Sequence, residues 1–165
     1  MPGHKGIKCD TACTDGQWDA DCRTPCGFCY NGTVCNKTSG KCPFTEGNPL
    51  CSAGYRYTDT TCRIPCADRQ WGVNCQTPCG FCYNGTVCNK TSGECSVTEG
   101  NLPCSPGYRY TDTTCRTPCE NGTWGDNCSV DCSENCKSGG CDFVTGACLG
   151  VCQLGFTGHR CETGV

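Results

Sequence analysis

The sequence predicts a small disulfide-rich fold: an elongated tandem array of cysteine-built modules with short β-hairpins and no helices of note. Cysteine accounts for 25 of the 165 residues, well above the level that marks a disulfide scaffold. Leu, Ile, Val and Phe together number only 19, too few for one apolar core to offset the conformational entropy of the chain. A segment of eight cysteines occurs twice with the same spacing, which is typical of a repeat architecture.

Composition also narrows the class of function. Disulfides at this density persist in oxidising surroundings, so we expect a secreted, extracellular protein. The net charge of −3 gives no reason to expect nucleic-acid binding. No apolar run approaches the length of a membrane-spanning helix, and residues 1–8 show no signal-peptide pattern, so we expect a mature chain or a fragment.

The first part of the chain is interpreted as a tail (residues 1–8) followed by a partial module (residues 9–25). The segment that begins at Cys9 aligns without gaps with two later segments, Cys62–Cys75 and Cys115–Cys128. In those copies the first cysteine needs a partner about ten residues upstream, and no cysteine precedes Cys9. Either the parent protein continues beyond this N-terminus and supplies the partner, or Cys9 is a free or intermolecular thiol.

Two complete modules follow at residues 26–78 and 79–131, offset by 53 residues, and a shorter third module occupies residues 132–165. Asn31-Gly32 predicts a tight hairpin turn, because a type I′ turn needs positive φ at both central residues. The Tyr55–Tyr57 segment predicts a short strand with both tyrosines on one face. The third module lacks this Tyr-rich loop and ends in CQLGFTGHRC.

The cysteine spacing of residues 9–161 resembles that of epidermal growth factor (EGF)-like modules. CQLGFTGHRC resembles the last loop of such a module, and the eight-cysteine repeats resemble the laminin-type variant and the arrays of multiple-EGF-domain receptors. Near-identical, Tyr-rich repeats also resemble bivalve byssal adhesive proteins such as those of scallops. One departure is the loop of eight residues between Cys95 and Cys104, where the family usually has one residue; it could lengthen the module or have a function of its own.

The laminin-type resemblance implies a disulfide pairing within each module. The pairs so implied are Cys13–Cys22 in the partial module; Cys26–Cys35, Cys29–Cys42, Cys51–Cys62 and Cys66–Cys75 in the first repeat; Cys79–Cys88, Cys82–Cys95, Cys104–Cys115 and Cys119–Cys128 in the second; and Cys132–Cys141, Cys136–Cys148 and Cys152–Cys161 in the third. Spacing alone does not choose among the possible connectivities.

Catalytic chemistry has few candidates in this sequence. The CGFC motif at Cys26 and Cys79 could serve redox chemistry or half a zinc site, but the surrounding βαβ pattern of a redox motif is absent, and structural disulfides are favoured. His4 and His159 are the only histidines, and we expect both to be exposed to solvent. No Ser/His/Asp or Cys/His arrangement can be nominated, so we expect a protein that is not an enzyme.

Calcium is the candidate ligand that the carboxylates suggest. The aspartate-rich run that precedes the first cysteine in calcium-binding EGF modules is absent, yet acidic residues gather in two stretches. The candidate ligands are Asp15, Asp19 and Asp21, with Asp10 beside them, and Glu120, Asp126, Asp131 and Glu134, with Asp142 beyond them. Ca²⁺ takes six to eight oxygen ligands, so weak calcium sites are one interpretation and a solvated acidic face is the other.

Two further sets of residues recur in register. N-glycosylation acceptors of the form Asn-x-Thr/Ser occur at Asn31, Asn36, Asn84, Asn89, Asn121 and Asn127. They fit a secreted surface, although turn chemistry alone explains Asn31, Asn84 and Asn121.

Tryptophan recurs at Trp18, Trp71 and Trp124, and an aromatic residue that recurs in this way usually packs against its own loop or the next module.

The sequence thus leaves three functional hypotheses. The first is an extracellular structural or adhesive matrix protein that self-assembles, with Ca²⁺ bridging or an intermolecular Cys9 disulfide, and that contacts other matrix proteins. The second is a ligand-binding ectodomain fragment of a multiple-EGF-domain receptor, and the third is a protease inhibitor. The near-identity of the repeats favours the first, because a ligand site normally requires one module to differ.

Overall fold

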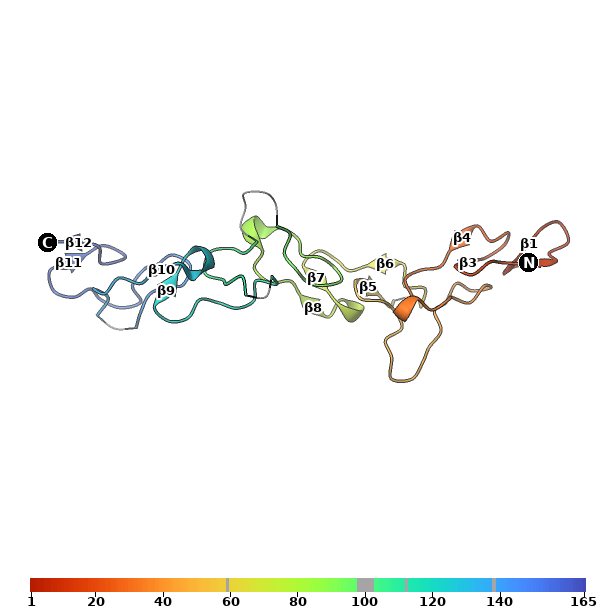
Figure 1. The fold of residues 1–165 in the computed structure, drawn as a ribbon, viewed down its shortest axis with the longest axis horizontal. Helices are drawn as coiled ribbons and strands as arrows, with labels where there is room; N and C mark the ends of the chain where they lie inside the picture. The colour runs from red at the N-terminus through yellow and green to blue at the C-terminus, as the bar shows by residue number, and fades with distance from the viewer. Residues whose placement is uncertain (59, 98–102, 112, 138) are drawn as a thin grey trace. The chain divides into compact units, whose positions relative to one another are not determined.

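A computed structural model describes residues 1–58, 60–97, 103–111, 113–137 and 139–165 (Figure 1). The predicted fold class is confirmed: the chain forms short two-stranded hairpins and twelve disulfides, and its described residues contain no helix beyond four single 3-10 turns. All twelve disulfides join cysteines that the laminin-type resemblance pairs, from Cys13–Cys22 to Cys152–Cys161. Each closes a loop of 9 to 13 residues.

Two compact units divide the chain. The first contains Met1–Pro78 and Asn89–Gly93, and the second contains Cys79–Cys88 and Glu94–Val165. The elements of the first unit are β1 (His4–Lys5), β2 (Thr11–Ala12), β3 (Gln17–Trp18), β4 (Thr24–Pro25), η1 (Tyr30–Gly32), β5 (Tyr55–Arg56), β6 (Ile64–Pro65), β7 (Gln70–Trp71), η2 (Val73–Cys75) and β8 (Thr77–Pro78). Those of the second are η3 (Tyr83–Gly85), β9 (Thr123–Trp124), η4 (Asp126–Cys128), β10 (Val130–Asp131), β11 (Phe156–Thr157) and β12 (Thr163–Gly164).

All strand pairs are antiparallel and only two residues long. Hairpins β1–β2, β3–β4, β5–β6 and β7–β8 lie in the first unit, and β9–β10 and β11–β12 lie in the second. Pairs this short are not stable on their own in water, since even a longer isolated hairpin is marginal. The hairpins therefore depend on the disulfides. Each disulfide reduces the conformational entropy of the unfolded chain and so stabilises the fold by about 2–3 kcal/mol for a loop of this length.

The buried interior of the protein consists mainly of cystine side chains. Among the described residues, every buried apolar side chain belongs to a cysteine except Leu50, which is 8% exposed. Leu50 packs in a cluster with the cystines of the first repeat, and Trp18 and Tyr55 cover its edge. The sequence needs few large aliphatic residues, because cystines take their place in the core.

A tryptophan packed on a glycine links each module to the next. Trp18 lies against Gly40, Trp71 against Gly93 and Trp124 against Gly146, so close that a Cβ atom at any of these glycines would collide with the indole ring. One backbone hydrogen bond supports each contact: the amides of Asp19, Gly72 and Gly125 donate to the carbonyls of Lys37, Lys90 and Phe143. The structure shows both of the packing partners expected for the tryptophans, since the indole nitrogens of Trp71 and Trp124 also donate to carbonyls of their own modules, those of Pro78 and Asp131.

The Asn31-Gly32 turn has the backbone that the sequence predicts but not the predicted hairpin. Both residues have positive φ, 52° for Asn31 and 69° for Gly32. Among the described residues, however, no strand pair flanks this turn, and it forms the 3-10 turn η1 instead. The Cys26–Cys35 disulfide closes the loop around this turn, so a covalent bond takes the place of a flanking strand pair.

The expected tail at residues 1–8 is wrong. His4–Lys5 form β1, which pairs with β2 just as β5 pairs with β6. The amide of Gly3 donates to the carbonyl of Asp19 at 3.0 Å, the same bond that Gly54 makes with Gly72 in the first repeat. His4 is only half-exposed, so it does not lie in a frayed terminus. These residues belong to the first module, whose loop before Cys9 is two residues shorter than its later copies.

Candidate functional site

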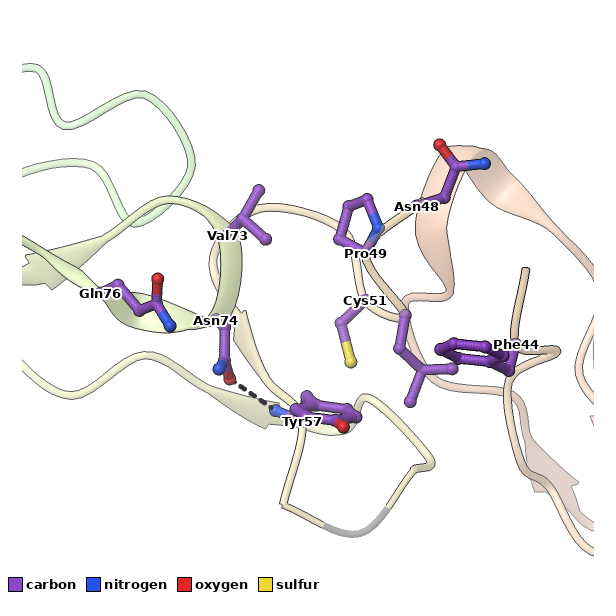
Figure 2. A pocket seen from close by; sticks show the side chains of 9 residues that line it. Phe44, Asn48, Pro49, Cys51, Tyr57, Val73, Asn74 and Gln76 are labelled. Carbon is purple, nitrogen blue, oxygen red and sulfur yellow. Dashed lines mark hydrogen bonds between the residues drawn. The ribbon is translucent and has the colours of Figure 1, made fainter. Parts of the chain in front are cut away.

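A groove of about 280 Å³ lies in the first complete repeat, within the first unit (Figure 2). The residues that line it are Phe44, Asn48, Pro49, Leu50, Cys51, Tyr57, Val73, Asn74 and Gln76. None of these side chains carries a charge at neutral pH. The groove therefore offers apolar surface together with a few amide groups, which is the usual composition of a binding pocket.

The loop between Cys42 and Cys51 forms one wall of this groove. It is the counterpart, 53 residues earlier, of the inserted loop whose purpose the sequence left open. Phe44 projects from the loop and is 76% exposed, whereas Leu50 at its end is buried among the cystines. The inserted loop thus has a buried anchor and a free aromatic side chain.

The opposite wall comes from η2 and the Tyr-rich loop. Asn74 in η2 has a left-handed backbone, with φ 54°, and its Oδ1 accepts a hydrogen bond of 3.3 Å from the amide of Tyr57, drawn as a dashed line in Figure 2. This bond fixes the loop against η2. Val73 and Tyr57 remain about half exposed, at 47% and 51%, so both have surface left for a partner.

The second repeat differs at the positions that correspond to this groove. Asp126 stands where the first repeat has Val73, Ser129 where it has Gln76, and Val97 where it has Phe44. The tyrosine and the asparagine remain, and Asn127 again accepts a hydrogen bond from the amide of Tyr110, at 3.1 Å. The scaffold of the groove is therefore shared by the two repeats, and its apolar lining is not.

Asp126 changes the electrostatics of the second repeat. The pKa of Tyr110 is raised, first by burial of its hydroxyl and second by the nearby negative charge of Asp126. A carboxylate at this position disfavours an apolar ligand, because a charge costs several kcal/mol when it is buried without a partner. One repeat of the two consequently has the composition of an apolar binding site.

Several of the proposed calcium ligands already have cationic neighbours. Asp15 pairs with Lys37 at 2.9 Å, Asp21 with Arg23 at 3.7 Å and Glu120 with Arg109 at 3.3 Å. All three carboxylates are more than half exposed, so each pair contributes little to stability. Lys37 belongs to the next module, which is why the local sequence around Asp15 suggested an unbalanced negative charge.

The other four proposed ligands lie apart from these pairs. Asp19 has a left-handed backbone with φ 79°, and Asp126 lies near Tyr110. Asp131 and Glu134 accept hydrogen bonds through their backbone carbonyls, from the indole nitrogen of Trp124 and the side-chain amide of Gln153 respectively. Among the described residues, three metal-ligating side chains converge only at Cys136, Cys148 and Cys161, all of which are half-cystines. Calcium binding by the seven carboxylates stays a prediction.

The remaining candidates for chemistry have structural roles or are isolated. The cysteines of both CGFC motifs lie in disulfides, and the carbonyl of Thr61 lies so close to Gly27 that no side chain fits there. The two histidines lie in different units. Cys9 has no disulfide partner within the chain, and its Sγ lies 3.3 Å from the terminal amino group.

Comparison with known proteins gives one informative similarity. No protein-family model matches the chain. A stretch of 71 residues is 39% identical to the angiopoietin-1 receptor of Danio rerio, which amounts to 43% of this chain and 5% of the receptor. The chain thus corresponds to a small part of that protein. In the part of the chain that the structure describes, no helix is long and apolar enough to cross a bilayer.

Proposed function

We propose that this chain is part of an extracellular recognition protein that has no catalytic activity, and that the groove of its first complete repeat binds a protein ligand. The observation that carries the proposal is the contrast between the repeats, because the groove of the first repeat has an uncharged lining and the position of its Val73 is taken by Asp126 in the second repeat. The likeness to a receptor and the density of disulfides support the same interpretation. The near-identity of the repeats, which had favoured a purely structural protein, does not extend to the groove.

The lining of the groove indicates what kind of ligand it takes. Phe44, Tyr57 and Val73 offer exposed apolar surface, and burial of one Leu- or Phe-sized side chain against them contributes about 1.5–3 kcal/mol. Asn48 and Gln76 can pair with backbone amides of the ligand. The groove is therefore suited to one apolar anchor residue of a protein, with the rest of the affinity coming from the surface around it.

A peptide selection tests this proposal even while the ligand is unidentified. The full chain is immobilised, and a phage-displayed library of random peptides is selected on it. We expect the enriched peptides to share a large apolar residue and to bind the Val73→Asp variant about 10- to 100-fold more weakly, because that variant places the carboxylate of the second repeat in the groove. In view of the name of the receptor, angiopoietin-1 is the first protein whose binding to the immobilised chain and to its Val73→Asp variant should be measured.

The matched control is Val87→Asp, the same change at a valine of the second repeat that is 42% exposed and lies outside the groove. The selected peptides should bind the Val87→Asp variant as tightly as they bind the unchanged chain. If the selected peptides bind Val73→Asp and the unchanged chain equally well, the groove is not the ligand site and the proposal fails.

Self-assembly into an adhesive or matrix material, as in a byssal protein, is the second candidate function. Cys9 favours it, since this cysteine occupies the place of a half-cystine in the later repeats yet is unpaired within the chain and half-exposed. Under oxidising conditions the chain should then form disulfide-linked dimers that the Cys9→Ser variant does not form, as measured by mass spectrometry without reduction. A chain that stays monomeric under these conditions would exclude this route to assembly.

Weak calcium binding is a further part of this second candidate. Asp19, Asp126, Asp131 and Glu134 are the ligands left without a cationic partner among the ion pairs of the described residues. Extracellular modules of this kind bind in the 10⁻⁴–10⁻³ M range. Calorimetric titration with CaCl₂ should show heats that the Asp126→Asn variant reduces; titration without any heat would remove calcium from the proposal.

A further inference from the structure

Two of the six Asn-x-Thr/Ser acceptors share a geometry. Asn36 and Asn89 stand at the same position in the two complete repeats, and both are exposed. In each, the side-chain Oδ1 accepts hydrogen bonds from the amide and the hydroxyl of the threonine two residues later. The amide bonds to Thr38 and Thr91 measure 3.0 and 2.8 Å, and both hydroxyl bonds measure 2.6 Å.

This geometry leaves the amide nitrogen available. The side-chain hydrogen bonds described at Asn36 and Asn89 all end on the oxygen Oδ1, so the turn does not use the nitrogen Nδ2. A substituent on Nδ2 would therefore leave the turn intact and extend from an exposed side chain. The turn is also local, since it joins residues two or three apart, so the short segment can adopt it before distant parts of the chain have folded.

The other acceptors lack this arrangement in the described contacts. The hydroxyls of Thr33 and Thr123 donate to the carbonyls of Tyr30 and Glu120, not to Asn31 and Asn121. Asn84 repeats the left-handed backbone of Asn31, with φ 53°.

At Asn127, the middle residue of the acceptor is Cys128, which is bound to Cys119. The Oδ1 of Asn127 accepts its hydrogen bond from the distant Tyr110. Occupation of this acceptor by a modifying enzyme therefore competes with formation of a disulfide.

We propose that Asn36 and Asn89 carry N-linked glycans, one at the same place in each complete repeat. The donor is an oligosaccharide attached to a lipid pyrophosphate. Nδ2 forms a bond to the anomeric carbon of the sugar and loses one proton, while the bond from that carbon to the pyrophosphate oxygen breaks and the lipid pyrophosphate leaves with the electron pair. No oxidant or reductant takes part. The proposal does not depend on the ligand of the groove.

The third module provides a matched control for this proposal. Asp142 occupies the place of Asn36 and Asn89, and its carboxylate accepts bonds from the amides of Val144 and Thr145 and from the Thr145 hydroxyl, at 2.8–3.1 Å. An aspartate thus supports the same kind of turn but offers no nitrogen to a sugar. The variants Asn36→Asp and Asn89→Asp should remove the acceptor while preserving the turn.

The test is a site-by-site glycan map of the full chain secreted from insect or mammalian cells. Peptide N-glycosidase digestion in H₂¹⁸O converts each occupied asparagine to a labelled aspartate, which mass spectrometry assigns to a position. We expect Asn36 and Asn89 to be the most occupied sites, and the double Asp variant to lose most of the glycan mass with an unchanged melting temperature. Unmodified peptides at both positions, or higher occupancy at Asn31, Asn84, Asn121 or Asn127, would overturn the proposal. The map of the unchanged chain decides this even if the variant is not secreted.

Discussion

The junctions between modules are built alike, whereas the groove faces of the two complete repeats are not. Each junction places a tryptophan of one module on a glycine of the next and adds the same backbone hydrogen bond. On the groove face, the two repeats keep a tyrosine and an asparagine but exchange Val73 for Asp126. Features that recur at 53-residue spacing thus hold the array together, and the positions where the copies differ show where a ligand can distinguish them.

The largest expected effect comes from changing a junction glycine. Gly93→Ala forces a methyl group into the ring of Trp71 and strains a backbone with φ 77°, so we expect a loss of about 2–4 kcal/mol of unfolding free energy and a red-shifted tryptophan emission. Gly32→Ala is the control, because Gly32 has a similar φ of 69° and open space around it. It should cost about 1 kcal/mol and leave the emission unchanged. Equal losses measured by thermal unfolding would mean that the indole contact does not hold the junction.

The disulfide framework could be anticipated from the sequence, because local spacing recurs. Every disulfide joins cysteines at most 13 residues apart, and the resemblance to laminin-type modules supplied the connectivity. The first module was harder to recognise. Gly3, His4 and Lys5 correspond to Gly54, Tyr55 and Arg56, but the shorter loop before Cys9 moves them out of the 53-residue register, so that they looked like a tail.

The groove could not be anticipated in the same way, since it depends on contacts between distant segments. The groove unites Phe44, Tyr57 and Val73, which lie on three different segments and show no common pattern in the sequence. The ion pair between Asp15 and Lys37 also crosses from one module to the next. The sequence identified the inserted loop as unusual, but only the fold shows that η2 faces it.

A smaller effect should separate the third junction from the second. The guanidinium of Arg160 lies 4.1 Å from the ring centre of Trp124, and its Nε donates to the carbonyl of Thr145 at 2.9 Å. Arg160→Gln should therefore cost about 1–2 kcal/mol and expose Trp124 to the quencher acrylamide. Arg63→Gln, at an exposed arginine, should change neither quantity. If both variants behave alike, the cation–π contact adds nothing to this junction.

The smallest effect concerns the turn beside each junction glycine and depends on pH. Hydrogen bonds from the amide and hydroxyl of Thr145, and from the amide of Val144, lower the pKa of Asp142 below the ordinary range of an aspartate. A carboxyl whose pKa is lowered by folding stabilises the fold above its unfolded pKa, and this contribution is lost as the pH falls through the folded value. Asn36 and Asn89 make the corresponding turns without a titrating group.

In NMR spectra recorded from pH 6 to pH 2, the signal of the Thr145 amide should shift with a midpoint below that of a free aspartate, and the signals of the Thr38 and Thr91 amides should not shift. The Asp142→Asn variant should abolish the shift, because the amide oxygen accepts the same bonds at every pH. Equal movement of all three amides would show instead that acid loosens the whole fold, and that the third junction does not differ from the other two.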